Sequence, residues 1–176
     1  MAPASDLSGT LKFELSSGTI TLDAEQRVLL FPVELLAPLS ASEAGLASLR
    51  SFGVSLGAAA RGAGASTAEE ALTALALQLA RSGFGRISLE RWGALLCVRL
   101  QGAPDTLTLD AQISFLEGVM NGISDQESGI YHIEDRFLVL DPVVAKALRR
   151  RTAQGEFEKL SDVIALLVQV KDGRLS

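Results

Sequence analysis

Pairs of strand-like segments joined by very short turns constrain the fold of this chain more than any other feature of its sequence. Residues 86–101 contain two apolar runs joined by a turn at Trp92-Gly93, and residues 130–140 contain two more. Apolar and polar residues alternate in these segments with the period of a half-buried strand. Since a turn this short joins only antiparallel neighbours, the sequence predicts a mainly antiparallel sheet.

Helical patterns occupy most of the remaining chain. Apolar residues recur at three- and four-residue spacing in residues 41–61, 66–83, 109–123, 143–151 and 157–170. Ser66-Thr67-Ala68-Glu69 is typical of a capping box at the start of the second segment, and Pro142 suits the first position of the fourth. Residues 9–31 again have strand-like alternation. This order of elements predicts an α+β fold with helices packed on the sheet.

The length and composition favour one globular domain. The chain has 176 residues, of which 48% are hydrophobic, and this is the size of an ordinary single domain. No linker and no internal repeat divides it, so we expect one domain over residues 1–176. Residues 141–176 are expected to form a helical extension at its C-terminal end.

The composition also argues against several classes of function. The net charge of −5 disfavours a nucleic-acid partner, which a basic surplus would favour. One cysteine, Cys97, and one histidine, His132, cannot build a disulfide framework or an ordinary zinc site, so we expect no metal and no cofactor. No apolar run approaches the ~18 residues of a membrane span, and the N-terminus lacks a signal-peptide pattern, so a cytoplasmic protein is expected.

Two pairs of glycines share a four-residue spacing. Gly53-Val54-Ser55-Leu56-Gly57 matches the nucleophile elbow of hydrolases, in which a strand-to-helix turn lifts the serine above a parallel sheet. Here the motif lies within a helical pattern, so close helix packing at Gly53 and Gly57 is the favoured interpretation. Gly118 and Gly122 also lie on one helix face. They favour close packing too, with a slot or a partner helix as the alternative.

Three polar features have both a functional and a structural interpretation. His132 could sense pH or bind a ligand, but a structural role is favoured because no cysteine or carboxylate cluster accompanies it. Cys97 is expected to be a buried small apolar side chain. Arg149-Arg150-Arg151 closes a predicted helix, where cations interact favourably with the helix dipole, and docking of an acidic partner is the alternative.

Several of these segments resemble a known group of sensory domains. Residues 18–22 and 27–31, followed by the helix with Gly53 and Gly57, resemble the start of the effector-sensing N-terminal region of XylR-type activators. The hairpin and the helix around residues 115–123 resemble the 4-vinyl-reductase-like small-molecule-binding domain. The pattern Phe-x-x-Gly-x-x-x-Gly-Ile on that helix is also similar to the small subunits of the TRAPP vesicle-tethering complex, which share the fold. The resemblance covers residues 9–140.

The resemblance implies an α+β domain that dimerises and encloses an apolar pocket between its helices and its sheet. Bacterial members of the family sense aromatic or other hydrophobic ligands. The pocket candidates on the elements that the family places around its cavity are Phe52, Leu56, Leu96, Phe115, Val119 and Met120. Many relatives carry metal-binding cysteines after the glycine helix, but residues 124–145 contain none. No metal site is therefore expected.

The sequence thus predicts a non-catalytic regulatory domain that binds a small hydrophobic ligand as a homodimer. Because we see no output domain attached, a separate protein partner is expected. The alternative is a dimeric adaptor on the same scaffold that binds no ligand and acts through protein contacts. A hydrolase with Ser55 as nucleophile is the third hypothesis, which labelling by an activity probe would test.

Overall fold

The computed structural model describes residues 11–14, 19–22, 26–28, 33–65, 67–81, 84–92, 95–157 and 159–171. The chain forms two compact units, Met1–Leu35 and Leu36–Ser176, and each is described by itself. The expectation of a single domain over residues 1–176 stays a prediction. In the first unit, β1 (Leu11–Glu14), β2 (Thr19–Leu22) and β3 (Gln26–Val28) form an antiparallel sheet in that order.

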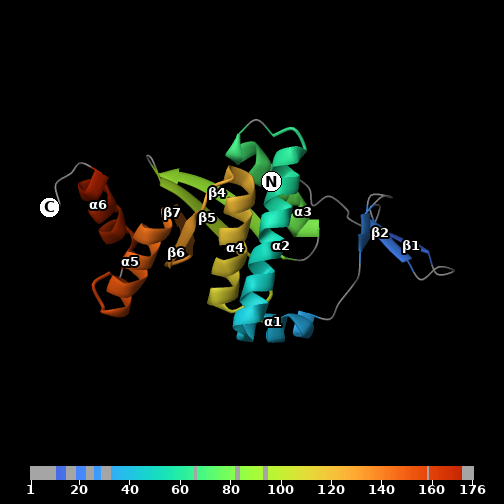
Figure 1. The fold of residues 1–176 in the computed structure, drawn as a ribbon, viewed down its shortest axis with the longest axis horizontal. Helices are drawn as coiled ribbons and strands as arrows, with labels where there is room; N and C mark the ends of the chain where they lie inside the picture. The colour runs from blue at the N-terminus through green and yellow to red at the C-terminus, as the bar shows by residue number, and fades with distance from the viewer. Residues whose placement is uncertain are drawn as a thin grey trace. The chain divides into compact units, whose positions relative to one another are not determined.

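The second unit contains the helices and the larger sheet (Figure 1). A short 3-10 helix, η2 (Val33–Leu36), precedes α1. The helices are α1 (Ala37–Ala41), α2 (Glu43–Gly62), α3 (Ala68–Arg81), α4 (Leu109–Ser124), α5 (Pro142–Ala153) and α6 (Leu160–Lys171). The strands are β4 (Arg86–Trp92), β5 (Leu95–Gln101), β6 (Gly129–Ile133) and β7 (Arg136–Leu140).

The four strands of the second unit form one antiparallel sheet in the order β4-β5-β7-β6. Trp92 is directly opposite Leu95, and Ile133 is opposite Arg136, so each predicted pair of strands is a hairpin with a short turn. The α+β class with a mainly antiparallel sheet is therefore confirmed. Its edges are β4 and β6.

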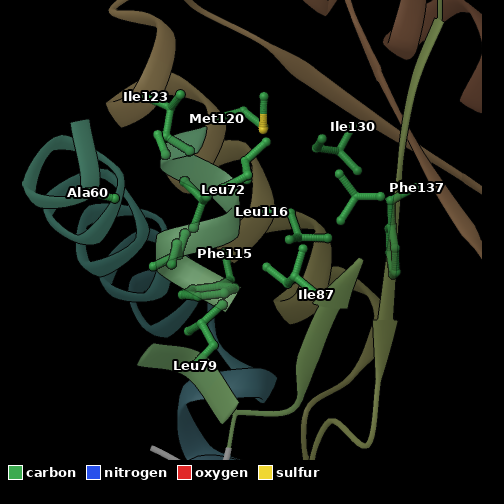
Figure 2. Packing of buried hydrophobic residues seen from close by; sticks show 14 residues of the cluster. Ala60, Leu72, Leu79, Ile87, Phe115, Leu116, Met120, Ile123, Ile130 and Phe137 are labelled. Atoms are coloured by element: carbon green, nitrogen blue, oxygen red, sulfur yellow. The ribbon is translucent and has the colours of Figure 1, made fainter. Parts of the chain in front are cut away.

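Helices cover both faces of this sheet, because its strands alternate apolar side chains toward two separate cores. The core on the α4 side contains Ala60, Ala71, Leu72, Leu75, Leu79, Ile87, Val98, Phe115, Leu116, Val119, Met120, Ile123, Ile130 and Phe137. Figure 2 shows its side chains pointing from the helices toward those of the strands. The core on the α5 side contains Cys97, Tyr131, Ile133, Leu138, Ala145, Leu148, Leu160 and Val163. The predicted C-terminal helices thus pack on the second face of the sheet.

Polar side chains cap the N-termini of several helices by accepting hydrogen bonds from backbone amides. Asp141 accepts hydrogen bonds from the amides of Val143 (2.8 Å) and Val144 (3.3 Å), ahead of α5. At α3, the hydroxyl of Thr67 accepts from the amide of Glu70 (3.1 Å), whose carboxylate accepts from the amide of Thr67 (3.3 Å). The capping box is therefore one residue later than predicted from Ser66 and Glu69. Thr67 and Glu70 offer the same chemistry at the same spacing, and the carboxylate of Glu69 pairs with Arg91 instead.

The closest contact between elements joins α2 and α4 through their glycines. A Cβ atom built on Gly53 would lie 2.4 Å from the carbonyl oxygen of Phe115, and one on Gly118 would lie 2.0 Å from that of Arg50. Cβ atoms on Gly57 and Gly122 would lie 2.3 and 2.2 Å from carbonyl oxygens of the opposite helix. These contacts advance in the same direction along both helices, so α2 and α4 are parallel, with their backbones touching.

We predict that Gly118→Ala lowers the free energy of unfolding by about 3 kcal/mol, because the added methyl group meets backbone that cannot rotate away. Gly62→Ala is the matched control: it ends the same α2 helix, and nothing lies within 4 Å of its added Cβ. It should leave stability unchanged or raise it by about 0.5 kcal/mol. Urea unfolding followed by circular dichroism measures both. Equal effects of the two substitutions would contradict the close backbone contact.

Candidate functional site

Most of the predicted pocket residues lie in or against the core on the α4 side. Phe115, Val119 and Met120 are buried on α4, with Val119 at 0% exposure. Leu56 on α2 and Leu96 on β5 are partly buried against the same core. Phe52 differs, because 44% of it is exposed. The structure therefore brings these residues to one side of the sheet and leaves Phe52 at the surface.

Three phenylalanine rings connect this surface position to the core. The ring of Phe52 lies 5.9 Å from that of Phe84 and 6.1 Å from that of Phe115, measured between centroids. Phe84 and Phe115 are stacked at 5.4 Å. These distances are those of favourable aromatic pairs. We call Phe52, Phe84 and Phe115 the phenylalanine ladder, since it runs from an exposed ring to one that is 2% exposed.

Phe84 was missed by sequence reasoning. It lies between α3 and β4, where its amide donates to the carbonyl oxygen of Leu79 (3.1 Å). The available signal was an aromatic residue directly after the predicted helix stop at Gly83. Such a position predicts a side chain packed in the loop after the helix, but it does not predict which helices Phe84 contacts.

The glycine contact limits where a ligand could lie. Because the backbones of α2 and α4 touch at Gly53, Gly57, Gly118 and Gly122, no space for a ligand separates these helices. The buried side chains of α4 extend instead toward α3 and the sheet, and Figure 2 shows Phe115 beside Leu79 of α3 and Leu116 beside Ile87 of β4 within one core. A ligand site built from the predicted residues is confined to the layer between the helices and the sheet.

A carboxylate, Glu117, holds the β6 edge next to this core. Its Oε1 accepts hydrogen bonds from the Arg149 guanidinium (2.6 Å) and from the amide of Ile130 (3.3 Å), and its Oε2 accepts from Arg50 (2.8 Å). Arg149 Nε also donates to the carbonyl oxygen of Ile130 (3.1 Å). Only 12% of the Glu117 side chain is exposed. We call Glu117, Arg50 and Arg149 the edge clamp, because it binds both backbone groups of one edge residue.

The edge clamp corrects the prediction for one residue of the arginine run, Arg149, which does more than close the helix. Arg150 and Arg151 do lie in the last turn of α5, and Arg151 pairs with Glu156 at 2.6 Å. Arg149 instead faces the sheet and ties α5 to α4. The difference arises because α5 packs on the sheet beside β6, which the local sequence does not reveal.

We predict that Glu117→Ala lowers the free energy of unfolding by about 1–3 kcal/mol, since it leaves the Ile130 amide without its acceptor and the Arg149 guanidinium without its carboxylate partner. Hydrogen exchange at the Ile130 amide should accelerate more than at amides in β5. Glu69→Ala is the control, because Glu69 forms an exposed pair with Arg91 and should contribute little. Unchanged exchange at Ile130 would be incompatible with the clamp.

His132 faces the α4 side of the sheet from β6. Its ring lies 4.8 Å from that of Phe137 on the neighbouring strand. Burial lowers the pKa of His132, and the nearby Asp135 carboxylate opposes this shift only in part. The folded protein therefore disfavours the charged imidazole.

We predict that His132 makes the protein less stable in mild acid. A lowered pKa means that the unfolded chain binds the proton more readily, so stability is complete above the unfolded pKa of about 6.5 and falls as the pH drops below it. Unfolding free energies measured at pH 7.5 and 5.5 should differ more for the wild type than for His132→Gln. The same difference in both proteins would refute this account of His132.

The surroundings of the remaining candidates, Ser55 and Cys97, favour structural roles for both. Ser55 is exposed in the middle of α2 and donates to the carbonyl oxygen of Ser51 (3.1 Å), so the strand-to-helix elbow that the hydrolase hypothesis needs is absent at this position. Cys97 is fully buried in the core on the α5 side, and burial raises the pKa of its thiol. Within the described ranges, no three histidine, cysteine or acidic side chains gather as a metal-binding group.

Comparison with known proteins identifies a shared fold. No protein-family model matches the sequence, and no curated protein matches it. The structure is similar to the crystal structure of the phenol-responsive sensory domain of the transcription activator PoxR with phenol. The TM-score is 0.52 at 15% sequence identity, over 77% of this chain and 86% of that chain. The chain has the fold of this sensory domain.

That likeness supports the expected sensory-domain fold, and the relationship to XylR-type activators stays a prediction. Relationships to the 4-vinyl-reductase-like domain and to TRAPP small subunits stay predictions. In the part of the chain that the structure describes, no helix is long and apolar enough to cross a membrane.

Proposed function

We propose that this protein is a regulatory domain that binds a small hydrophobic ligand, forms a homodimer and signals to a separate protein. The observation that carries the proposal is the fold shared with a phenol-responsive sensory domain. The proposed site is the layer between the helices and the sheet, with Leu56, Leu96, Phe115, Val119 and Met120 as its candidate residues and Phe52 at its exposed end. A cytoplasmic location and a non-catalytic role belong to the same proposal.

The chemistry of this layer favours an uncharged ligand. Every buried residue of the core on the α4 side is hydrophobic, so a charged ligand would lose its hydration there without gaining a partner from these side chains. Affinity would come mainly from burial of apolar area. Met120 suits this role because its flexible thioether side chain can repack around ligands of different shapes.

The phenylalanine ladder suggests both an entry point and a preference for aromatic rings. Phe52 is the exposed end of the ladder, and rotation of its side chain would uncover the stacked rings of Phe84 and Phe115 without moving the backbone. An incoming aromatic ring could then lie between the rotated Phe52 ring and Phe84, and contact both. Offset and edge-to-face pairs of this kind contribute about 0.5–1.5 kcal/mol beyond area burial.

The adaptor remains the second candidate, because the glycine contact makes α2 and α4 a closely packed pair that needs no ligand to complete it. On this hypothesis the core is solid, and partner proteins bind the outer surface. The two candidates differ in one measurable property, which is whether an apolar molecule stabilises the protein.

We predict that native mass spectrometry of the freshly purified full chain shows an added mass that denaturation releases, and that phenol raises the melting temperature after this compound is removed. A ligand at a hundred times its dissociation constant stabilises by about 2.7 kcal/mol. A clean mass, together with no stabilisation by phenol or toluene up to their solubility limits, would favour the adaptor.

Phe52→Ala tests whether phenol binds at the phenylalanine ladder. Loss of the outer ring should weaken phenol binding by about two- to tenfold, which corresponds to one aromatic contact. Val143→Ala is the control, because Val143 is 75% exposed on α5 and lies outside the proposed site. If both variants bind phenol equally, the ladder is not part of the site.

A further inference from the structure

The two edge strands of the second unit's sheet, β6 and β4, differ in whether neighbouring side chains bind their backbone groups. On β6, the edge clamp binds both backbone groups of Ile130, which blocks this residue from pairing with another strand. Unpaired edges are sites where further strands can add. The edge clamp therefore protects β6 against addition of a strand at this position.

The β4 edge has no such protection among the described residues. No described strand of the second unit pairs with its outer side, and no described side chain of that unit binds its backbone. The neighbouring helix α3 packs against β4 through Leu72, Leu75 and Leu79, which share a core with Ile87. Among the described residues of the second unit, the outer backbone groups of β4 thus have no partner strand.

The sequence of β4 is complementary to itself. When two copies pair antiparallel with Ser88 opposite Ser88, Arg86 of each copy faces Glu90 of the other, and Ile87 faces Leu89. Arg86 is exposed and has no ionic partner among the described residues. Opposite charges and apolar pairs directly across an antiparallel ladder are stabilising.

Glu90 can accept a further cation. It already accepts hydrogen bonds from Arg136 (2.9 Å), Arg99 (3.5 Å) and the Trp92 indole (3.3 Å), and the bond with Arg136 is the main cause that lowers the pKa of Glu90. An ionised carboxylate has about four acceptor positions, so Arg86 of a second copy can share it.

The alternative register is less favourable. With Leu89 opposite Leu89, the cation Arg91 would face Ile87, and Arg86 would face Trp92. That arrangement pairs a charge with an apolar side chain and leaves Glu90 opposite Ser88. The charge pattern of β4 therefore selects the register centred on Ser88.

We infer that two copies of this chain join through their β4 strands, antiparallel and centred on Ser88, into one continuous sheet across a two-fold axis. The interface is isologous, since the same residues contribute from both copies. This inference rests on the homodimer in the proposed function and assigns its surface. It is independent of whether a ligand binds.

Cross-linking of full-length variants tests the register. Directly opposed Cα atoms in an antiparallel pair are about 4.5–5.5 Å apart, within the range of a disulfide. Ser88→Cys should therefore form a covalent dimer under mild oxidation, while the natural Cys97 is fully buried. Ser55→Cys, an exposed serine on α2, should not. A covalent dimer from Ser55→Cys but not from Ser88→Cys would overturn the inference.

Charge reversal tests the energetics. Arg86→Glu places like charges opposite each other at two symmetric positions, and the dimer dissociation constant should rise by about tenfold or more in sedimentation experiments. Arg150→Glu, exposed on α5, is the control and should leave it unchanged. A protein that is monomeric throughout, or a dimer that Arg86→Glu does not weaken, would overturn the β4 interface. Phenol stabilisation, measured on the same samples, reports separately on the ligand proposal.

Discussion

The backbone contact between α2 and α4 is the constraint on which the second unit depends. Four glycines let two parallel helices touch, where Cβ atoms would approach carbonyl oxygens to 2.0–2.4 Å. This contact fixes which side of α4 faces the sheet, and so it places Phe115, Val119 and Met120 in one core. It also closes the space between the helices. Among the described residues, the predicted pocket side chains of α4 are then left to line the apolar layer between the helices and the strands.

The second constraint is the edge clamp, a group of polar contacts that connects helices on the two faces of the sheet. The sheet separates the core on the α4 side from the core on the α5 side. Glu117 reaches past the β6 edge, and its bonds to Arg50 and Arg149 connect α2, α4 and α5. A ligand that shifted α4 would therefore change the geometry at the β6 edge and at α5, which is a physical route from the proposed site to the far face.

Local patterns in the sequence predict the helices and strands, but they do not predict which distant side chains contact one another. The hairpins, α4 and the glycine pairs follow from spacing alone, because turn length and helical period are local properties. The capping box of Thr67 and Glu70 shows the limit of such reasoning. Ser66 and Glu69 have the same capping-box spacing one residue earlier, but Glu69 pairs with Arg91 on β4. Phe84 and the edge clamp were beyond sequence reasoning, since each depends on segments far apart in the chain. Their partners are fixed only when the sheet and helices pack together.

The central claim is that an apolar ligand binds in the layer between α4 and the sheet, and Met120 gives the most direct test. The chain has only one other methionine, Met1, so a methyl-labelled sample yields a simple spectrum. Titration with phenol, or with the compound released from the purified protein, should move the Met120 methyl resonance until it saturates, because an aromatic ring bound nearby changes its magnetic environment. A Met120 resonance that stays unchanged up to the solubility limit of these compounds would contradict the claim.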